Sequence, residues 1–189
     1  MLVLMIRFAP LAFALSMLAP AAIAQTCPDA PDHSAAAHQA IEQLKAAPSE
    51  RDSRVFNSML WEMWLDAPDG RAQNMLKEGM ARRQTFDLVG AVVVFSDLIA
   101  YCPDYAEGWN QRAFAYYLQT DFESALADLD EALARNPEHI AALSGKALTL
   151  MGLGRAQMAQ DVLRDALEMN PWLPERVYLV DISPPGEDL

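Results

Sequence analysis

A proline that returns at a fixed interval restricts the fold of this chain more than any other feature. Pro103, Pro137 and Pro171 are separated by 34 residues each time. Small and large apolar residues keep the same interval, as in the series Ala91, Ala125, Ala159 and the series Phe95, Leu129, Leu163. A shared period of this length predicts stacked supersecondary units, each of which contacts only its neighbours.

Each unit is predicted to be a pair of helices. In residues 106–139, Trp109, Ala113 and Tyr116 fall at helical spacing, and a second apolar run at helical spacing extends from Phe122 to Leu133. Thr120 and Asp121 lie between the two runs, where the aspartate can cap the second helix. The recurring alanines predict that paired helices approach each other closely.

This pattern resembles the tetratricopeptide repeat (TPR) family. The family's signature of Trp, Tyr, Ala, a large apolar residue, Ala and Pro is matched by Trp109, Tyr116, Ala125, Leu129, Ala132 and Pro137. A second copy keeps Leu143, Leu150, Ala159, Leu163, Ala166 and Pro171, and a weaker copy runs from Ala72 to Pro103. The family's Leu-Gly pair is replaced by Arg112-Ala113 and Lys146-Ala147. The resemblance implies an all-α, right-handed α-solenoid of antiparallel helix pairs.

The period and the resemblance divide the chain into four parts. Residues 71–171 hold three repeats, at about 72–105, 106–139 and 140–173. Residues 25–70 read as an N-terminal segment and a divergent helix pair, which we expect to cap the solenoid as terminal repeats do. Residues 172–189 are predicted to be a C-terminal tail with at most a short helix, because Pro174, Pro184 and Pro185 interrupt any longer one.

Residues 1–24 have the layout of a secretory signal peptide. Arg7 precedes an apolar run, and Ala22 and Ala24 form a small-residue box, so cleavage is expected after about Ala24. An uncleaved anchor or a lipid on Cys27 are the alternatives. The apolar run is short for a membrane span, and the small-residue box does not directly precede the cysteine. We therefore expect export to the periplasm, with no membrane insertion after cleavage.

The chain has two cysteines, Cys27 and Cys102, each in a Cys-Pro-Asp tripeptide. In an oxidising compartment they are expected to form a disulfide, and the alternatives are two free thiols or a metal pair. Two cysteines with neither CxxC spacing nor a nearby histidine make a poor metal site.

The composition and motifs argue against several classes of function. A net charge of −12 disfavours nucleic acid and anionic lipid as partners. No nucleophile, metalloprotease or phosphate-loop motif is present in the sequence, so no enzyme activity, catalytic residue or cofactor is predicted. Met59, Met63, Met75 and Met80 leave open a soft-metal or redox carrier, although methionines on an apolar helix face are usually core residues.

Protein binding is the remaining function. The resemblance places the concave-facing positions on the first helix of each repeat, here Leu76, Met80, Arg83, Asn110, Phe114, Tyr117, Ser144, Leu148 and Met151. The lysine, asparagine and arginine clamp with which some family members bind a peptide's C-terminal carboxylate is replaced by Leu76, Met80, Gln111, Ala141 and Gly145. The expected partner is an apolar peptide or helix of another protein, with basic flanks. The alternatives are self-association into a homo-oligomer and occupation of the groove by residues 176–180 of the chain itself.

Overall fold

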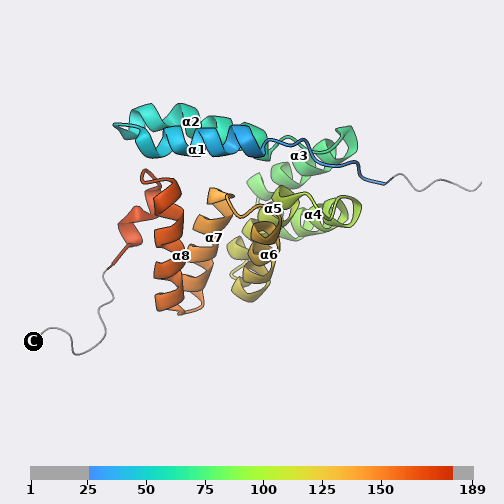
Figure 1. The fold of residues 1–189 in the computed structure, drawn as a ribbon. Coiled ribbons are helices and arrows are strands. Elements are labelled where there is room, and N and C mark those ends of the chain that lie inside the picture. Colours follow the sequence, from blue (N-terminus) through green and yellow to red (C-terminus); the bar gives the residue numbers. More distant parts are fainter. Residues whose placement is uncertain (1–25, 181–189) are drawn as a thin grey trace, which may run out of the picture.

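The computed structural model describes residues 26–180 as an all-α protein, which confirms the predicted fold class. The described residues form eight α-helices and one 3-10 helix and contain no strand. Their bounds are α1 Ser34–Ala46, α2 Glu50–Trp64, α3 Gly70–Gln84, α4 Leu88–Tyr101, α5 Ala106–Leu118, α6 Phe122–Arg135, α7 Ile140–Gly152, α8 Ala156–Met169 and η1 Pro174–Tyr178 (Figure 1). The predicted signal peptide lies outside the described residues, and within them no helix is long and apolar enough to span a membrane.

Aspartates mark the start of several helices. Asp69, Asp87 and Asp121 each accept a hydrogen bond from the backbone N–H three residues later, which satisfies a donor that the first helical turn leaves free. The turns within the three repeats are also alike, because Phe86, Thr120 and Gly154 all have positive φ. These positions are 34 residues apart, so the same left-handed turn reverses the chain in each repeat.

The six helices α3 to α8 stack as three antiparallel pairs, and each helix packs against the next along the chain. The alanines in phase with the repeat are fully buried between the paired helices, as predicted from the sequence. Gly79 has the same role in α3, because a Cβ atom there would collide with the ring of Phe95. Small residues therefore set the close spacing of the pairs, and larger ones such as Phe95 fill the core between them.

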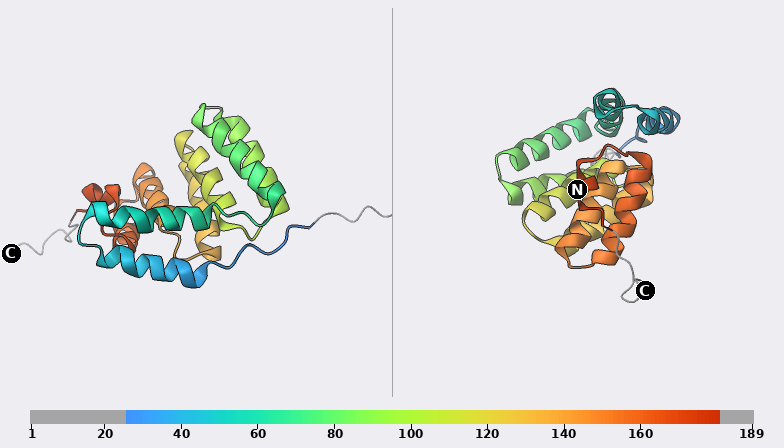
Figure 2. Two further views of the ribbon diagram at one scale, coloured as in Figure 1. Left: turned by 90° about the horizontal axis from the view of Figure 1, so that it is seen from above. Right: turned by 90° about the vertical axis from the view of Figure 1, so that its left-hand side faces the viewer.

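The expected N-terminal helix pair is present as α1 and α2, but it does not stack beside α3 as a further unit of the solenoid. Instead, α1 and α2 lie crosswise over the ends of α7 and α8 (Figures 1 and 2). One apolar cluster joins Ile41 and Leu60 of this pair to Ile140, Ala166 and Leu173 at the other end of the chain. The pair thus bridges the first and last parts of the solenoid.

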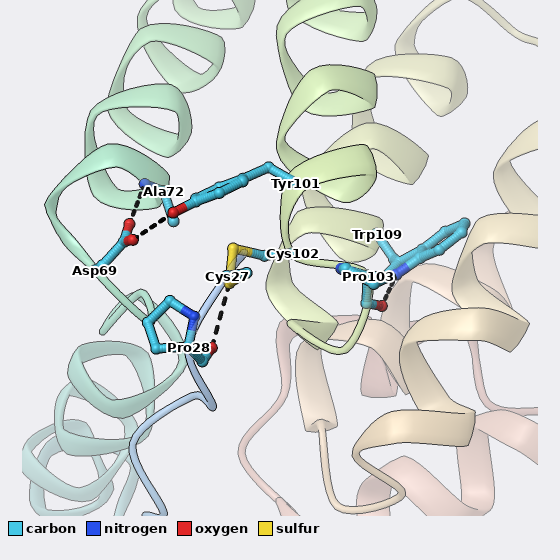
Figure 3. The surroundings of a disulfide bond; sticks show 8 residues. All are labelled: Cys27, Pro28, Asp69, Ala72, Tyr101, Cys102, Pro103 and Trp109. Carbon is cyan, nitrogen blue, oxygen red and sulfur yellow. Dashed lines mark hydrogen bonds between the residues drawn. A yellow bond between two sulfur atoms is a disulfide. The ribbon is translucent and has the colours of Figure 1, made fainter. Parts of the chain in front are cut away.

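A disulfide fastens the segment that precedes α1. Cys27 is bonded to Cys102 at the C-terminus of α4, across 75 residues of sequence (Figure 3). Next to it, the Tyr101 hydroxyl donates a hydrogen bond of 2.6 Å to the cap residue Asp69. The C-terminus of α2 is held as well, because the Tyr105 hydroxyl donates a hydrogen bond of 2.7 Å to the backbone carbonyl of Trp64. Both ends of the pair are therefore attached close to the junction of α4 and α5.

Candidate ligand-binding groove

A cavity of about 580 Å³ lies on the inner side of the solenoid. Its inner wall comes from α3, α5 and α7, and it is bounded elsewhere by α2 and by residues 172–175, before and at the start of η1. The cavity owes its shape to the crosswise N-terminal pair, because α2 contributes Trp61 and Trp64 where an isolated solenoid would be open. Its size suits a few side chains or a small organic molecule.

Seven of the nine predicted groove residues line this cavity: Met80, Arg83, Asn110, Phe114, Tyr117, Ser144 and Leu148. Leu76 does not, because it is 0% exposed in the core between α3 and α4. Met151 is partly exposed but lies outside the cavity lining. Of the seven, Phe114 is the large apolar side chain that stays open to solvent, with 43% exposure.

Sequence reasoning missed the part of the lining that comes from outside the repeats. Trp61, Trp64, Trp172 and Leu173 all face the cavity. Trp61 packs edge to face on Trp64, with ring centroids 5.3 Å apart. Its position off the apolar stripe of α2 was a signal of contact with another element, but the repeat pattern contains no information on where α2 lies.

Beneath the cavity is a buried polar network centred on Glu107. Its carboxylate accepts hydrogen bonds from His139 Nε2 at 2.8 Å, Asn110 Nδ2 at 2.9 Å and Gln111 Nε2 at 2.6 Å. The side chains of Glu107 and His139 are each 1% exposed. His139 Nδ1 accepts the N–H of Ala142 and so caps α7, which leaves Nε2 as the donor to the carboxylate.

The same network holds α2 in place. Trp64 stacks on the imidazole of His139, with ring centroids 4.2 Å apart and an interplanar angle of 15°. Burial raises the pKa of the Tyr105 hydroxyl well above its usual range, and the nearby charges of Glu107 and Asp66 raise it further. These effects favour the protonated hydroxyl, which donates the hydrogen bond to α2.

Arg83 is the cation of the inner wall. Its Nη2 donates to Gln111 Oε1 at 3.1 Å, and its guanidinium lies 4.4 Å from the ring centroid of Phe114. Burial lowers the pKa of this guanidinium, and the negative charge of Glu107, which lies behind Gln111, partly opposes that shift. A positive charge is therefore held in a half-buried position with a neutral amide as its nearest hydrogen-bond acceptor.

Four buried side-chain polar atoms of the described residues have no hydrogen-bond partner, and all four belong to residues that line the cavity. They are Trp64 Nε1, Arg83 Nε, Trp172 Nε1 and Glu175 Oε2. Unsatisfied buried polar groups are rare in folded proteins and cost free energy. Their concentration around one cavity distinguishes it from the rest of the described structure.

The residues considered for metal binding are scattered. Within residues 26–180, no three side chains of His, Cys, Asp or Glu come together as a metal site. Met63 packs against the core formed by the N-terminal pair, while Met75 and Met80 pack against the core of α3 and α4. The methionines thus belong to different clusters, and Met59 is exposed.

Residues 176–180 do not occupy the cavity. They are exposed and lie beside α8. The Gln160 side chain of α8 donates a hydrogen bond to the backbone carbonyl of Tyr178 and accepts one from the backbone N–H of Val180. The sequence alternative in which this segment fills the groove is therefore wrong for these residues, while residues 181–189 lie outside the described chain.

Comparison with known proteins agrees with the repeat assignment. Residues 106–139 and 140–171 each match the tetratricopeptide repeat family, so the chain carries tetratricopeptide repeats. A TPR repeat-containing protein of Rhizobium etli is 30% identical over 136 residues, which cover 70% of this chain and 65% of that protein. The chain thus spans slightly less than two thirds of this relative's length.

Solved structures resemble this one in fold. The first TPR of Spaghetti (RPAP3), bound to the HSP90 peptide SRMEEVD, has a TM-score of 0.56 and 21% identity, and the match covers 58% of this chain and 88% of that one. The TPR2B domain of yeast Sti1 in its pHsp70 complex has a TM-score of 0.55 and 22% identity, with 59% and 91% covered. At this identity the likeness establishes a helical-repeat solenoid and nothing further.

Proposed function

We propose that this protein is a non-catalytic interaction module that binds a peptide or helix of another protein in the cavity on its concave side. The observation that carries the proposal is the cavity itself, which seven predicted groove residues line together with aromatic side chains of α2. Exposed Phe114 and the nearby Tyr117 supply apolar surface where a ligand would enter. A repeat domain of similar fold, the first TPR of Spaghetti, is bound to an HSP90 peptide, which supports this mode of binding.

We further propose that the protein acts in the periplasm. The sequence of residues 1–24 supports export, and a disulfide between Cys27 and Cys102 is the pairing expected of an oxidising compartment. Cell fractionation and N-terminal sequencing test this proposal. A mature chain that begins near Gln25 in the periplasmic fraction is expected, whereas an intact N-terminus in the cytoplasm would refute it.

The binding proposal is tested by cross-linked affinity capture with the full chain as bait. The double variant Phe114→Ala/Tyr117→Ala removes apolar surface from the cavity, and Phe86→Ala/Tyr178→Ala removes exposed aromatic rings elsewhere. A protein captured by the wild type and by the second variant, but not by the first, is the expected result. Capture that the first variant retains in full, with its fold intact, would contradict a role for the cavity.

Self-association is a second candidate, because apolar side chains stay exposed at both ends of the solenoid. Phe86 and Val89 lie at the start of α4, and Val177 and Val180 follow α8. Size-exclusion chromatography with light scattering separates the two functions. A stable oligomer of the purified chain without any ligand would favour this second candidate, and a monomer would favour the binding module.

A further inference from the structure

We propose that Arg83 binds a carboxylate of the ligand, so that the segment recognised by the cavity combines apolar side chains with one negative charge. This inference rests on the proposed function and specifies the chemistry of the partner. The carboxylate belongs either to an acidic side chain within the segment or to the end of a peptide chain. Arg83 is not one of the positions at which the family's carboxylate clamp would lie in this sequence.

The comparison of Arg83 with the other arginines is the first argument. The other partly buried arginines of the described residues, Arg82, Arg112, Arg135 and Arg164, each have a carboxylate oxygen within 3.0 Å. Arg83 is partly buried as well, but it forms no such ion pair with any of the described residues. A guanidinium that has lost part of its water and has no counter-ion is an unfavourable arrangement unless a ligand supplies one.

The orientation of the guanidinium is the second argument. Phe114 lies against its face and Gln111 holds Nη2, so the side chain is already fixed before a ligand arrives. Nε is buried without a partner, and the planar group keeps further N–H donors for an acceptor in the cavity. A fixed guanidinium loses little conformational entropy when it binds a carboxylate, which favours selective binding.

The surrounding charges limit where a second charge can go. Glu107 lies behind Gln111 and is already held by three donors, so it attracts Arg83 only at longer range. Glu175 also lines the cavity, its buried Oε2 has no hydrogen-bond partner, and its negative charge disfavours a second ligand carboxylate beside it. Because the full chain has a net charge of −12, the expected ligand is an apolar segment with one carboxylate and basic flanks.

Selection from a library of random 12-residue peptides tests this inference. One library places the random segment before a Gly-Ser linker, and the other ends in a free C-terminus, so the two possible sources of the carboxylate are separated. Both are selected on the full wild-type chain, on Arg83→Gln and on the matched control Arg82→Gln, which removes one charge from the same helix outside the cavity.

We expect wild type and Arg82→Gln to select peptides with an acidic residue or with a free terminus, and Arg83→Gln to lose this preference. Replacing the carboxylate of a selected peptide by an amide should weaken binding to wild type by roughly ten- to a hundredfold, the value of a hydrogen bond to a charged group, and change binding to Arg83→Gln little. If the selected peptides lack this preference and bind Arg83→Gln equally well, the inferred ligand carboxylate is wrong, while the proposed binding function stands. Failure to select any peptide, or equal binding by Phe114→Ala/Tyr117→Ala, would count against both.

Discussion

The substitution Glu107→Gln tests whether the buried network under the cavity holds the fold together. The wild-type carboxylate accepts hydrogen bonds from His139, Asn110 and Gln111. The amide has the same shape, but it has a single acceptor oxygen, and its NH₂ group must face a donor. A buried hydrogen bond to a charged group contributes about 1.5–3 kcal/mol, and we expect a loss of that size in the free energy of unfolding. For a chain of this length, that corresponds to a decrease in Tm of roughly 3–12 °C.

Urea denaturation followed by circular dichroism measures this loss directly. The control is Glu131→Gln, whose carboxylate is 52% exposed and pairs with Arg135 on the surface, where the expected cost is about 0.5 kcal/mol or less. A double-mutant cycle with His139→Gln should give a coupling energy of about 1 kcal/mol or more, because the two groups are in direct contact. If Glu107→Gln costs no more than the surface control, the network does not stabilise the fold as we argue.

Three further outcomes are expected from the structure. Gly79→Ala should destabilise the protein by about 1–3 kcal/mol, because the new Cβ overpacks against the buried ring of Phe95. Gly108→Ala should stabilise it by about 0.5–1 kcal/mol, because the nearest atoms lie 3.5 Å from the new Cβ and alanine favours a helix. Equal effects of the two variants in thermal denaturation would contradict the packing argument. Replacing Cys27 and Cys102 by serine should lower stability by up to about 4.5 kcal/mol, the chain-entropy value for a 75-residue loop, and thiol titration of denatured, unreduced wild type should find no free thiol. The hydrogen bond from Arg82, and then the helix-cap bond from the Gly90 N–H, lower the pKa of Asp87. The stabilisation by this carboxylate is therefore present above its unfolded pKa of 3.8 and is lost as the pH falls through the folded value. Asp87→Asn should make the free energy of unfolding less dependent on pH in the acid range, and an unchanged dependence would refute this.

The sequence was sufficient to predict the repeat part of the fold, because that part rests on local, periodic information. A repeat contacts only its neighbours, so the buried positions return every 34 residues and can be recognised without the structure. Ala91 and Ala125 are buried for this reason, as predicted. The resemblance to tetratricopeptide repeats, and not the period itself, placed the first helix of each repeat on the concave side, and seven of the nine positions taken from it line the cavity.

The exceptions within the repeats also have a physical cause. Leu76 has the phase of a groove residue, but its side chain completes the core between α3 and α4. His139 and Glu107 are 32 residues apart, at the two ends of the repeat 106–139, and a polar pair between them leaves no periodic apolar signal. His139 caps α7 from a fully buried position, where its other ring nitrogen donates to Glu107.

By itself, the sequence determined the helix pairs, their order and the face each one buries, because these depend on contacts within a repeat and with the next one. Only the tertiary structure decided where the N-terminal pair lies. Its position depends on a core shared by residues about a hundred positions apart, such as Ile41 and Ile140, and on a disulfide that spans 75 residues. Such contacts have no period, and they turn an open concave face into a cavity that contains a cation without a counter-ion.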